Sequence, residues 1–130
     1  MIEEKKYLGI DWGEKRIGLA MADGVTRLAL PLQTVSSVKE LLEVIEIEEI
    51  DALVLGKPMK MSGDEADSQV WLNFLEQLKE KFSGEIELVD ERLTSLAGDA
   101  LEGHKKEKAS RDEIAAVLIL QSYLDAYGRD

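Results

Sequence analysis

The sequence predicts an α/β fold with a mixed five-stranded sheet, in the chain order β-β-β-α-β-α-β-α, and helices on both faces. Three observations support this prediction: short apolar runs of strand length early in the chain, a change to helical spacing after residue 36, and later apolar runs that alternate with helical segments. Strands separated by helices are expected to be parallel through right-handed crossovers, whereas strands joined by short turns form an antiparallel meander.

The first three strands are expected at Tyr7–Ile10, Ile17–Ala22 and Leu28–Val35. Asp23-Gly24 is a hairpin signal between the second strand and the third. Pro31 cannot donate to a strand ladder, so the third strand is expected to lie at an edge or to carry a bulge.

The remaining elements alternate between helix and strand. The first helix is expected to begin at the capping box Ser37–Glu40, and a compact apolar strand follows at Ala52–Leu55. The fifth strand is expected at Ile86–Val89, running into Asp90-Glu91-Arg92. The second helix is recognised by an apolar face with helical spacing, formed by Trp71, Phe74, Leu75, Leu78 and Phe82.

The last part of the chain is expected to contain one further long helix. A short helical stretch after Thr94-Ser95 leads into a loop at Gly103–Ala109, and the helix opens at Ser110. Its inner stripe is formed by Ala115, Ala116, Ile119, Leu120, Tyr123 and Leu124.

Length and composition indicate one globular domain spanning residues 1–130. The apolar fraction of 45% is too high for a disordered chain. There are no cysteines, which excludes disulfides, thiolate metal sites and cysteine nucleophiles. The N-terminus lacks the apolar stretch of a signal peptide, and no apolar run approaches the ~20 residues that cross a bilayer. We therefore expect a soluble, cytoplasmic protein with no membrane partner.

The net charge of −11 opposes nucleic-acid binding, because an acidic chain repels a polyanion at long range. Most of these charges are expected on solvated helix faces, and many of the acids lie together in the first helix and the residues that follow it. The cations gather elsewhere, beside the candidate site segments: Lys15, Arg16, Lys57, Lys60, Arg92, Lys105, Lys106, Lys108 and Arg111.

Two strand ends carry acids that could form a site. Asp11 follows the first strand, and ligands in such sheets bind outside the carboxyl ends of strands; an Asp there can equally stabilise a turn. Asp90 and Glu91 end the fifth strand, where neighbouring side chains point to opposite faces, so only one of them is expected to face a given site. A structural salt bridge with Arg92 is the simpler alternative.

Asp112 is a third candidate, in the first turn of the last helix. The helix dipole alone favours an acid there. Asp112 also shares the inward stripe of that helix, however, and burying an uncompensated charge costs several kcal/mol. A divalent cation shared by Asp11, Glu91 and Asp112 would remove this cost. Such carboxylate clusters suit Mg²⁺ or Mn²⁺, and two such ions about 4 Å apart promote phosphodiester hydrolysis.

Other candidate residues have weaker signals. His104 lies in a lysine-rich loop and is more simply explained as a solvated side chain. Trp12 suits either base stacking or hydrophobic anchoring. Gly9, Gly13 and Gly18 form neither a Walker loop nor a dinucleotide-binding fingerprint.

Several segments together resemble the YqgF family, also called RuvX-type resolvases, over nearly the whole chain. They occur in the family's order: Leu8–Gly18, Gly56-Lys57-Pro58, Ser62-Gly63, Asp90–Thr94, Asp112–Ala116 and Leu120–Leu124. The resemblance implies a ribonuclease H-like fold and a metal-dependent nuclease. Its biology is divided between resolving Holliday junctions and maturing the 5′ end of precursor 16S rRNA in ribosome biogenesis, of which we favour the second.

The resemblance also implies residue roles. Asp11 and Asp112 would be Mg²⁺ or Mn²⁺ ligands, and Glu91 a ligand or general base. Glu91 would replace the acid that related nucleases carry on the fourth strand, which here ends in Gly56-Lys57-Pro58. The substrate phosphates would be held by four cations, Lys15, Arg16, Lys57 and Arg92.

Two other functions fit parts of the pattern. A relative of the actin and sugar-kinase superfamily would share the core and bind Mg-ATP, although those proteins use two such domains. A non-catalytic module that binds rRNA or a protein would explain the acidic surface. A resolvase acting on a two-fold symmetric junction is expected to be a homodimer.

Overall fold

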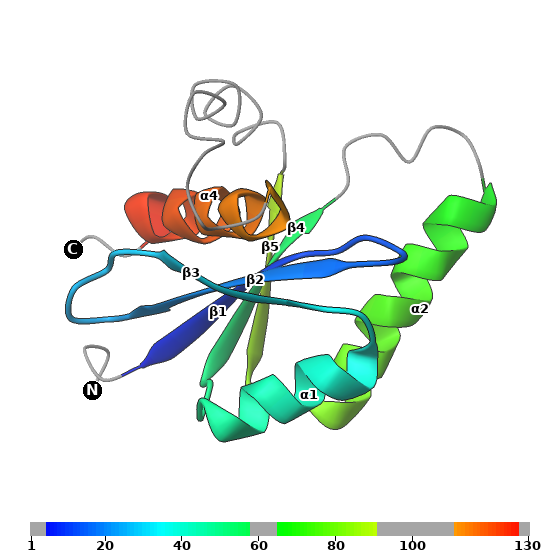
Figure 1. Ribbon diagram of the computed structural model, residues 1–130, viewed down its shortest axis with the longest axis horizontal. Helices are drawn as coiled ribbons and strands as arrows, with labels where there is room; N and C mark the ends of the chain where they lie inside the picture. Colours follow the sequence, from blue (N-terminus) through cyan, green and yellow to red (C-terminus); the bar gives the residue numbers. More distant parts are fainter. Residues whose placement is uncertain (1–4, 58–64, 91–110, 128–130) are drawn as a thin grey trace.

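The computed structural model describes residues 5–57, 65–90 and 111–127 of the chain (Figure 1). Its elements follow the order expected from the sequence. They are β1 (Lys6–Asp11), β2 (Ile17–Asp23), β3 (Leu30–Val35), α1 (Val38–Ile47), β4 (Ala52–Lys57), α2 (Glu65–Lys81), β5 (Glu85–Asp90) and α4 (Arg111–Tyr127).

The five strands form one sheet in the order β3-β2-β1-β4-β5. β1 and β2 are antiparallel, as are β2 and β3, whereas β4 runs parallel to both β1 and β5. This confirms the predicted combination of a meander with crossover-linked strands. The carboxyl ends of β1, β4 and β5 therefore lie at one edge of the sheet, where β2 begins.

Helices cover both faces of the sheet, as predicted: α4 packs on one face, and α1 and α2 pack on the other (Figure 1). The face toward α1 and α2 is built of large side chains such as Leu8, Leu19 and Leu53. The face toward α4 is lined mostly by small ones, including Ala20 and Ala52. The sheet therefore packs large side chains against α1 and α2, and mostly small side chains against α4.

The connection between β2 and β3 is longer than the Asp23-Gly24 signal predicts, because β3 begins at Leu30 rather than Leu28. The carboxylate of Asp23 accepts hydrogen bonds from the backbone N–H groups of Val25 (2.9 Å) and Thr26 (2.7 Å), which holds a wider turn. β3 is an edge strand, and its register with β2 shifts between Leu19 and Ala20, opposite Pro31. Both consequences predicted for Pro31 are confirmed.

α1 begins as its capping box predicts, with one difference. The Ser37 hydroxyl accepts a hydrogen bond from the Glu40 N–H at 3.2 Å. The Glu40 carboxylate bonds the N–H of Ser36 at 2.7 Å, one residue before the capping residue itself. Hydrogen bonds donated to this carboxylate, first by the Ser36 N–H and then by the Ser36 hydroxyl, hold the pKa of Glu40 below its ordinary value.

The predicted helical stretch after Thr94-Ser95 and the loop Gly103–Ala109 with His104 lie outside the described residues. Within the described ranges, no helix is both long enough and apolar enough to cross a membrane.

Candidate active site

The candidate site begins with a row of residues at the edge of the sheet. Gly18 of β2 pairs with Asp11 of β1 on one side and with Thr34 of β3 on the other. Directly paired residues of antiparallel strands have Cα atoms roughly 4.5–5.5 Å apart. The row Thr34–Gly18–Asp11 therefore crosses three strands within a short distance.

The side chain of Asp11 lies on the face that α4 covers. Side chains alternate along a strand, and Leu8 and Ile10 of β1 point into the core beneath α1 and α2. Gly9 faces the other way, because a Cβ on it would meet Leu120 of α4. Asp11 is two positions after Gly9, so its side chain points to the same face of the sheet, and it is half-buried.

The first turn of α4 lies directly over this row. A Cβ on Gly18 would overlap the carbonyl group of Asp112 and come within 2.8 Å of its Cβ. The structure thus places Asp112 directly over Gly18, the residue that pairs with Asp11 on the neighbouring strand. The Asp112 side chain is 32% exposed, so it is less buried than its inward stripe suggests, and the Nε of Arg16 lies 3.7 Å from its Oδ2.

A second contact of the same helix turn was not expected from the sequence. The hydroxyl of Thr34 donates a hydrogen bond to Glu113 Oε2 at 3.0 Å, linking β3 to the residue after Asp112. In the sequence, Glu113 has the position of the acid in a capping box that begins at Ser110, which is a local role within the helix. No sequence signal connects it with Thr34, because the pair depends on the β2–β3 register.

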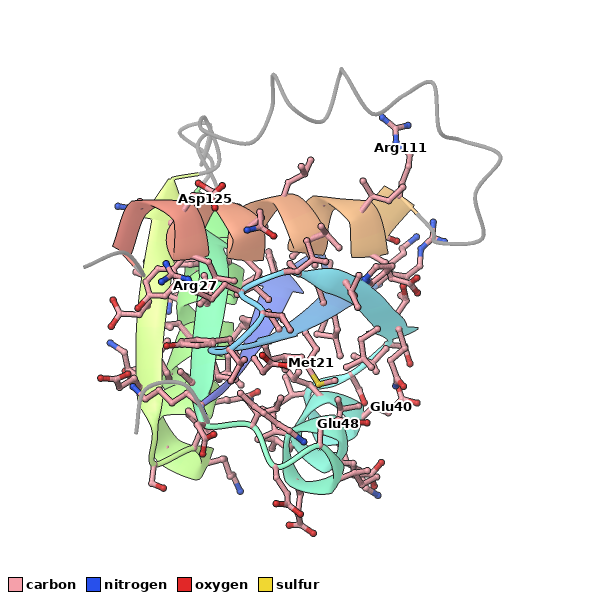
Figure 2. All side chains as sticks on the ribbon, turned by 90° about the vertical axis from the view of Figure 1, so that its left-hand side faces the viewer. Met21, Arg27, Glu40, Glu48, Arg111 and Asp125 are labelled. Atoms are coloured by element: carbon pink, nitrogen blue, oxygen red, sulfur yellow. The ribbon has the colours of Figure 1, made fainter. Side chains whose placement is uncertain are left out.

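The cations predicted to hold phosphates lie around this edge in different orientations. Lys15 and Arg16 are exposed in the turn between β1 and β2, and Arg16 contacts Asp112. Lys57 ends β4 with the parity of Leu55, which places it on the α1–α2 face, opposite to Asp11. Arg111, the first residue of α4 and not one of the four cations predicted to hold phosphates, is exposed and extends away from the sheet (Figure 2).

Part of the predicted site lies outside the described residues, namely Glu91 and Arg92. The backbone of Asp90 ends β5 in register with Lys57. Within residues 5–57, 65–90 and 111–127, no three acidic, histidine or cysteine side chains are grouped closely enough to hold a metal ion. The described part of the site is thus a pair of acids, Asp11 and Asp112.

Trp12 anchors the turn that follows Asp11. Its ring packs against Phe74 of α2 with centroids 5.7 Å apart and the planes at 35°. Trp12 is half-buried against the core beneath α1 and α2. Of its two predicted roles, the hydrophobic anchor is the one the contacts support.

The sheet order, with α4 on one face and α1 and α2 on the other, is that of a ribonuclease H-like fold, the class that the family resemblance implies. The chain resembles the structure titled "T. thermophilus RuvC in complex with Holliday junction substrate" with a TM-score of 0.63, 15% identity and coverage of 96% of this chain and 97% of that one. A resolvase of Fowlpox virus, solved with Holliday junction DNA, gives a TM-score of 0.60 at 11% identity, covering 93% and 97%.

The family model described as "RuvX: Holliday junction resolvase" matches residues 5–126, and the chain belongs to this family. Two relatives carry the name "Putative pre-16S rRNA nuclease". That of Endomicrobium trichonymphae is 35% identical, over 92% of this chain and 95% of the relative. That of Dictyoglomus thermophilum is 36% identical, over 96% and 99%. The resemblance seen in the sequence is confirmed, and the family is one of nucleases.

Proposed function

We propose that this protein is a Mg²⁺- or Mn²⁺-dependent endonuclease that processes the 5′ end of precursor 16S rRNA. The observation that carries the proposal is the convergence of Asp11 and Asp112 on one face of the sheet edge, where Asp11 pairs with Gly18 and Asp112 lies directly over Gly18. The names of the full-length relatives support the choice of substrate. The proposal includes a single nuclease domain, residues 1–130, acting in the cytoplasm.

The residues of the site fit a hard divalent cation. Asp11 and Asp112 come from different elements, are half-buried and present only oxygen ligands, which Mg²⁺ and Mn²⁺ prefer. Glu91 is the proposed third acid. It lies outside the described residues and is proposed from the family resemblance. When bound, the ion would lower the pKa of the attacking water and neutralise charge on the phosphate.

The chain's own cations would orient the substrate around these acids. Arg16 is 74% exposed while it contacts Asp112, so its guanidinium can bind a phosphate without unfolding the turn. Lys15 is its neighbour in the chain, and Arg92, which lies outside the described residues, is proposed from the family resemblance as a further phosphate contact. Lys57, on the opposite face of the sheet, would contact a part of the substrate that passes around the edge.

The proposal is tested by Asp11→Asn, assayed on precursor 16S rRNA with Mg²⁺ or Mn²⁺. Loss of a ligand that stabilises transition-state charge by several kcal/mol lowers cleavage by about a thousandfold. Glu76→Gln, an exposed change on α2, is the matched control and is expected to cleave normally. Unfolding by urea checks that both variants are folded. Full cleavage by Asp11→Asn, or by the wild type in a chelator, contradicts the proposal.

A Holliday junction is the second candidate substrate, favoured by the family description and by the two structural neighbours. The same assay with a four-way DNA junction distinguishes the two substrates. Resolution of the junction by paired cuts would also require a homodimer, which sedimentation detects. Binding of rRNA that survives alanine at Asp11, Glu91 and Asp112, with no cleavage of either substrate, would indicate a non-catalytic module instead.

A further inference from the structure

The space between α4 and the sheet is lined by unusually small residues. Gly9, Gly18, Ala20 and Ala52 face the helix from three adjacent strands, and Ala116 faces them from the helix. Glycine in a strand costs conformational entropy and removes packing, so it is expected where another backbone approaches closely. Here the approaching backbone is that of α4.

The closest approach is at Gly18. An added Cβ there would overlap the carbonyl carbon and oxygen of Asp112, which are main-chain atoms that cannot move without the helix. Gly18 is also the cross-strand partner of Asp11. One glycine therefore contacts the backbone of one acid and pairs with the other.

Gly9 makes a similar contact further along the helix. A Cβ there would lie 2.7 Å from Leu120 Cβ and 2.8 Å from the Ala116 carbonyl oxygen. These atoms are one to two turns beyond Asp112, away from the site. Gly9 and Gly18 thus pack the same helix on the same sheet face, but only Gly18 does so at an acid.

We propose that Gly18 is a positioning residue that sets the height of the Asp112 carboxylate above Asp11. This inference rests on the proposed function, in which both acids bind one metal ion. A methyl group at Gly18 would raise the first turn of α4 from the sheet and withdraw Asp112 from Asp11. The longer side chain of Asp112→Glu would reach back across that added distance.

The test compares wild type, Gly18→Ala, Asp112→Glu and the double variant by calorimetric titration with Mn²⁺ alone and by cleavage of precursor 16S rRNA. Each single variant is expected to lower Mn²⁺ affinity by about tenfold or more. Cleavage falls by about 100-fold, the effect of a 1 Å misplacement. The double variant is expected to bind and cleave better than Gly18→Ala, which a purely structural role for Gly18 does not predict.

Gly9→Ala is the matched control, since it overpacks the same helix away from the acids. It is expected to lower Tm while Mn²⁺ affinity stays unchanged. Wild-type affinity in Gly18→Ala, or equal loss in Gly18→Ala and Gly9→Ala, overturns the positioning role. If Gly18→Ala does not fold, Asp112→Glu decides, because undiminished Mn²⁺ binding would show that the spacing is not set for Asp. A wild type that neither binds Mn²⁺ nor cleaves refutes the proposed function itself.

Discussion

Among single residues, Arg16 lies beside Asp112 and is the proposed link between the site and the substrate. Its contact with Asp112 is long and exposed, so it adds little to stability, typically under about 1 kcal/mol. Arg16→Gln is therefore expected to leave unfolding unchanged but to weaken nucleic-acid binding and reduce its salt slope by about 1. Titrations at several salt concentrations measure the slope. Lys39→Gln, an exposed change on α1, is the control, and an equal effect there would contradict a phosphate contact at Arg16.

The lowered pKa of Asp23 leads to a prediction about how the stability of the fold depends on pH. Its pKa lies below the ordinary value of 3.8, first because of the Thr26 N–H and then through the Thr26 hydroxyl and the Val25 N–H. A carboxylate with a lowered pKa stabilises the fold above its unfolded-state pKa, and this contribution is lost as pH falls through the folded-state pKa. The difference in unfolding free energy between wild type and Asp23→Ala is expected to be constant near neutral pH.

That difference then narrows as pH falls below the ordinary Asp value of 3.8. Urea unfolding at a series of pH values measures it. A difference that stays the same under acid conditions would show that the turn is held by the shape of Asp23 rather than by its charge.

Among the elements, α4 is held toward its C-terminal end by the loop between β2 and β3. Gln121 accepts a hydrogen bond from the Ala29 N–H at 2.9 Å and donates one to the Arg27 carbonyl at 3.1 Å. Arg27 in turn donates to the Leu124 carbonyl at 2.7 Å. Because these bonds lie more than two turns from Asp112, the helix is fixed at its far end independently of the site.

Gln121→Leu leaves the N–H of Ala29 without its partner and is expected to destabilise the fold by about 1–3 kcal/mol. Urea unfolding measures the change, with Ser122→Ala, the next residue of the helix, as the control. Mn²⁺ affinity is expected to stay the same, since the first turn of α4 keeps its contacts with Gly18 and Thr34. A loss of affinity equal to that of Gly18→Ala would show that the two ends of α4 are coupled.

The sequence predicts the elements well because each carries a local signal. The capping residue Ser37, the period of Trp71–Leu78 and the stripe of α4 all depend on neighbours within four positions, and all are confirmed. The pairing of Thr34 with Glu113 and the contact of Gly18 with Asp112 depend on strand register and helix placement. The residues of these two pairs are 79 or more positions apart in the chain, so no repeating pattern in a single sequence predicts that they are in contact.

At the scale of the whole molecule, the charged side chains that give the net charge of −11 are unevenly distributed. The acids of α1 lie on the opposite side of the sheet from the site, and Figure 2 shows Glu40 and Glu48 at α1, far from Arg111 on α4. Packed layers are spaced by about 10 Å, and the Debye length at physiological salt is about 8 Å. The acids of α1 are therefore screened from a bound substrate in the cell, although they act over longer distances at low salt.

Removing three exposed acids of α1 and α2 tests this separation: Glu43→Gln, Glu46→Gln and Glu76→Gln, combined in one variant. At about 0.01 M salt the Debye length is about 30 Å, so the variant is expected to associate with nucleic acid several-fold faster than wild type. At about 0.15 M the two rates are expected to converge, and cleavage of the bound substrate is equal throughout. Stopped-flow measurements of the association rate check both conditions. A rate difference that persists at physiological salt would mean that the nucleic acid extends over the α1–α2 face, the face on which Lys57 also lies.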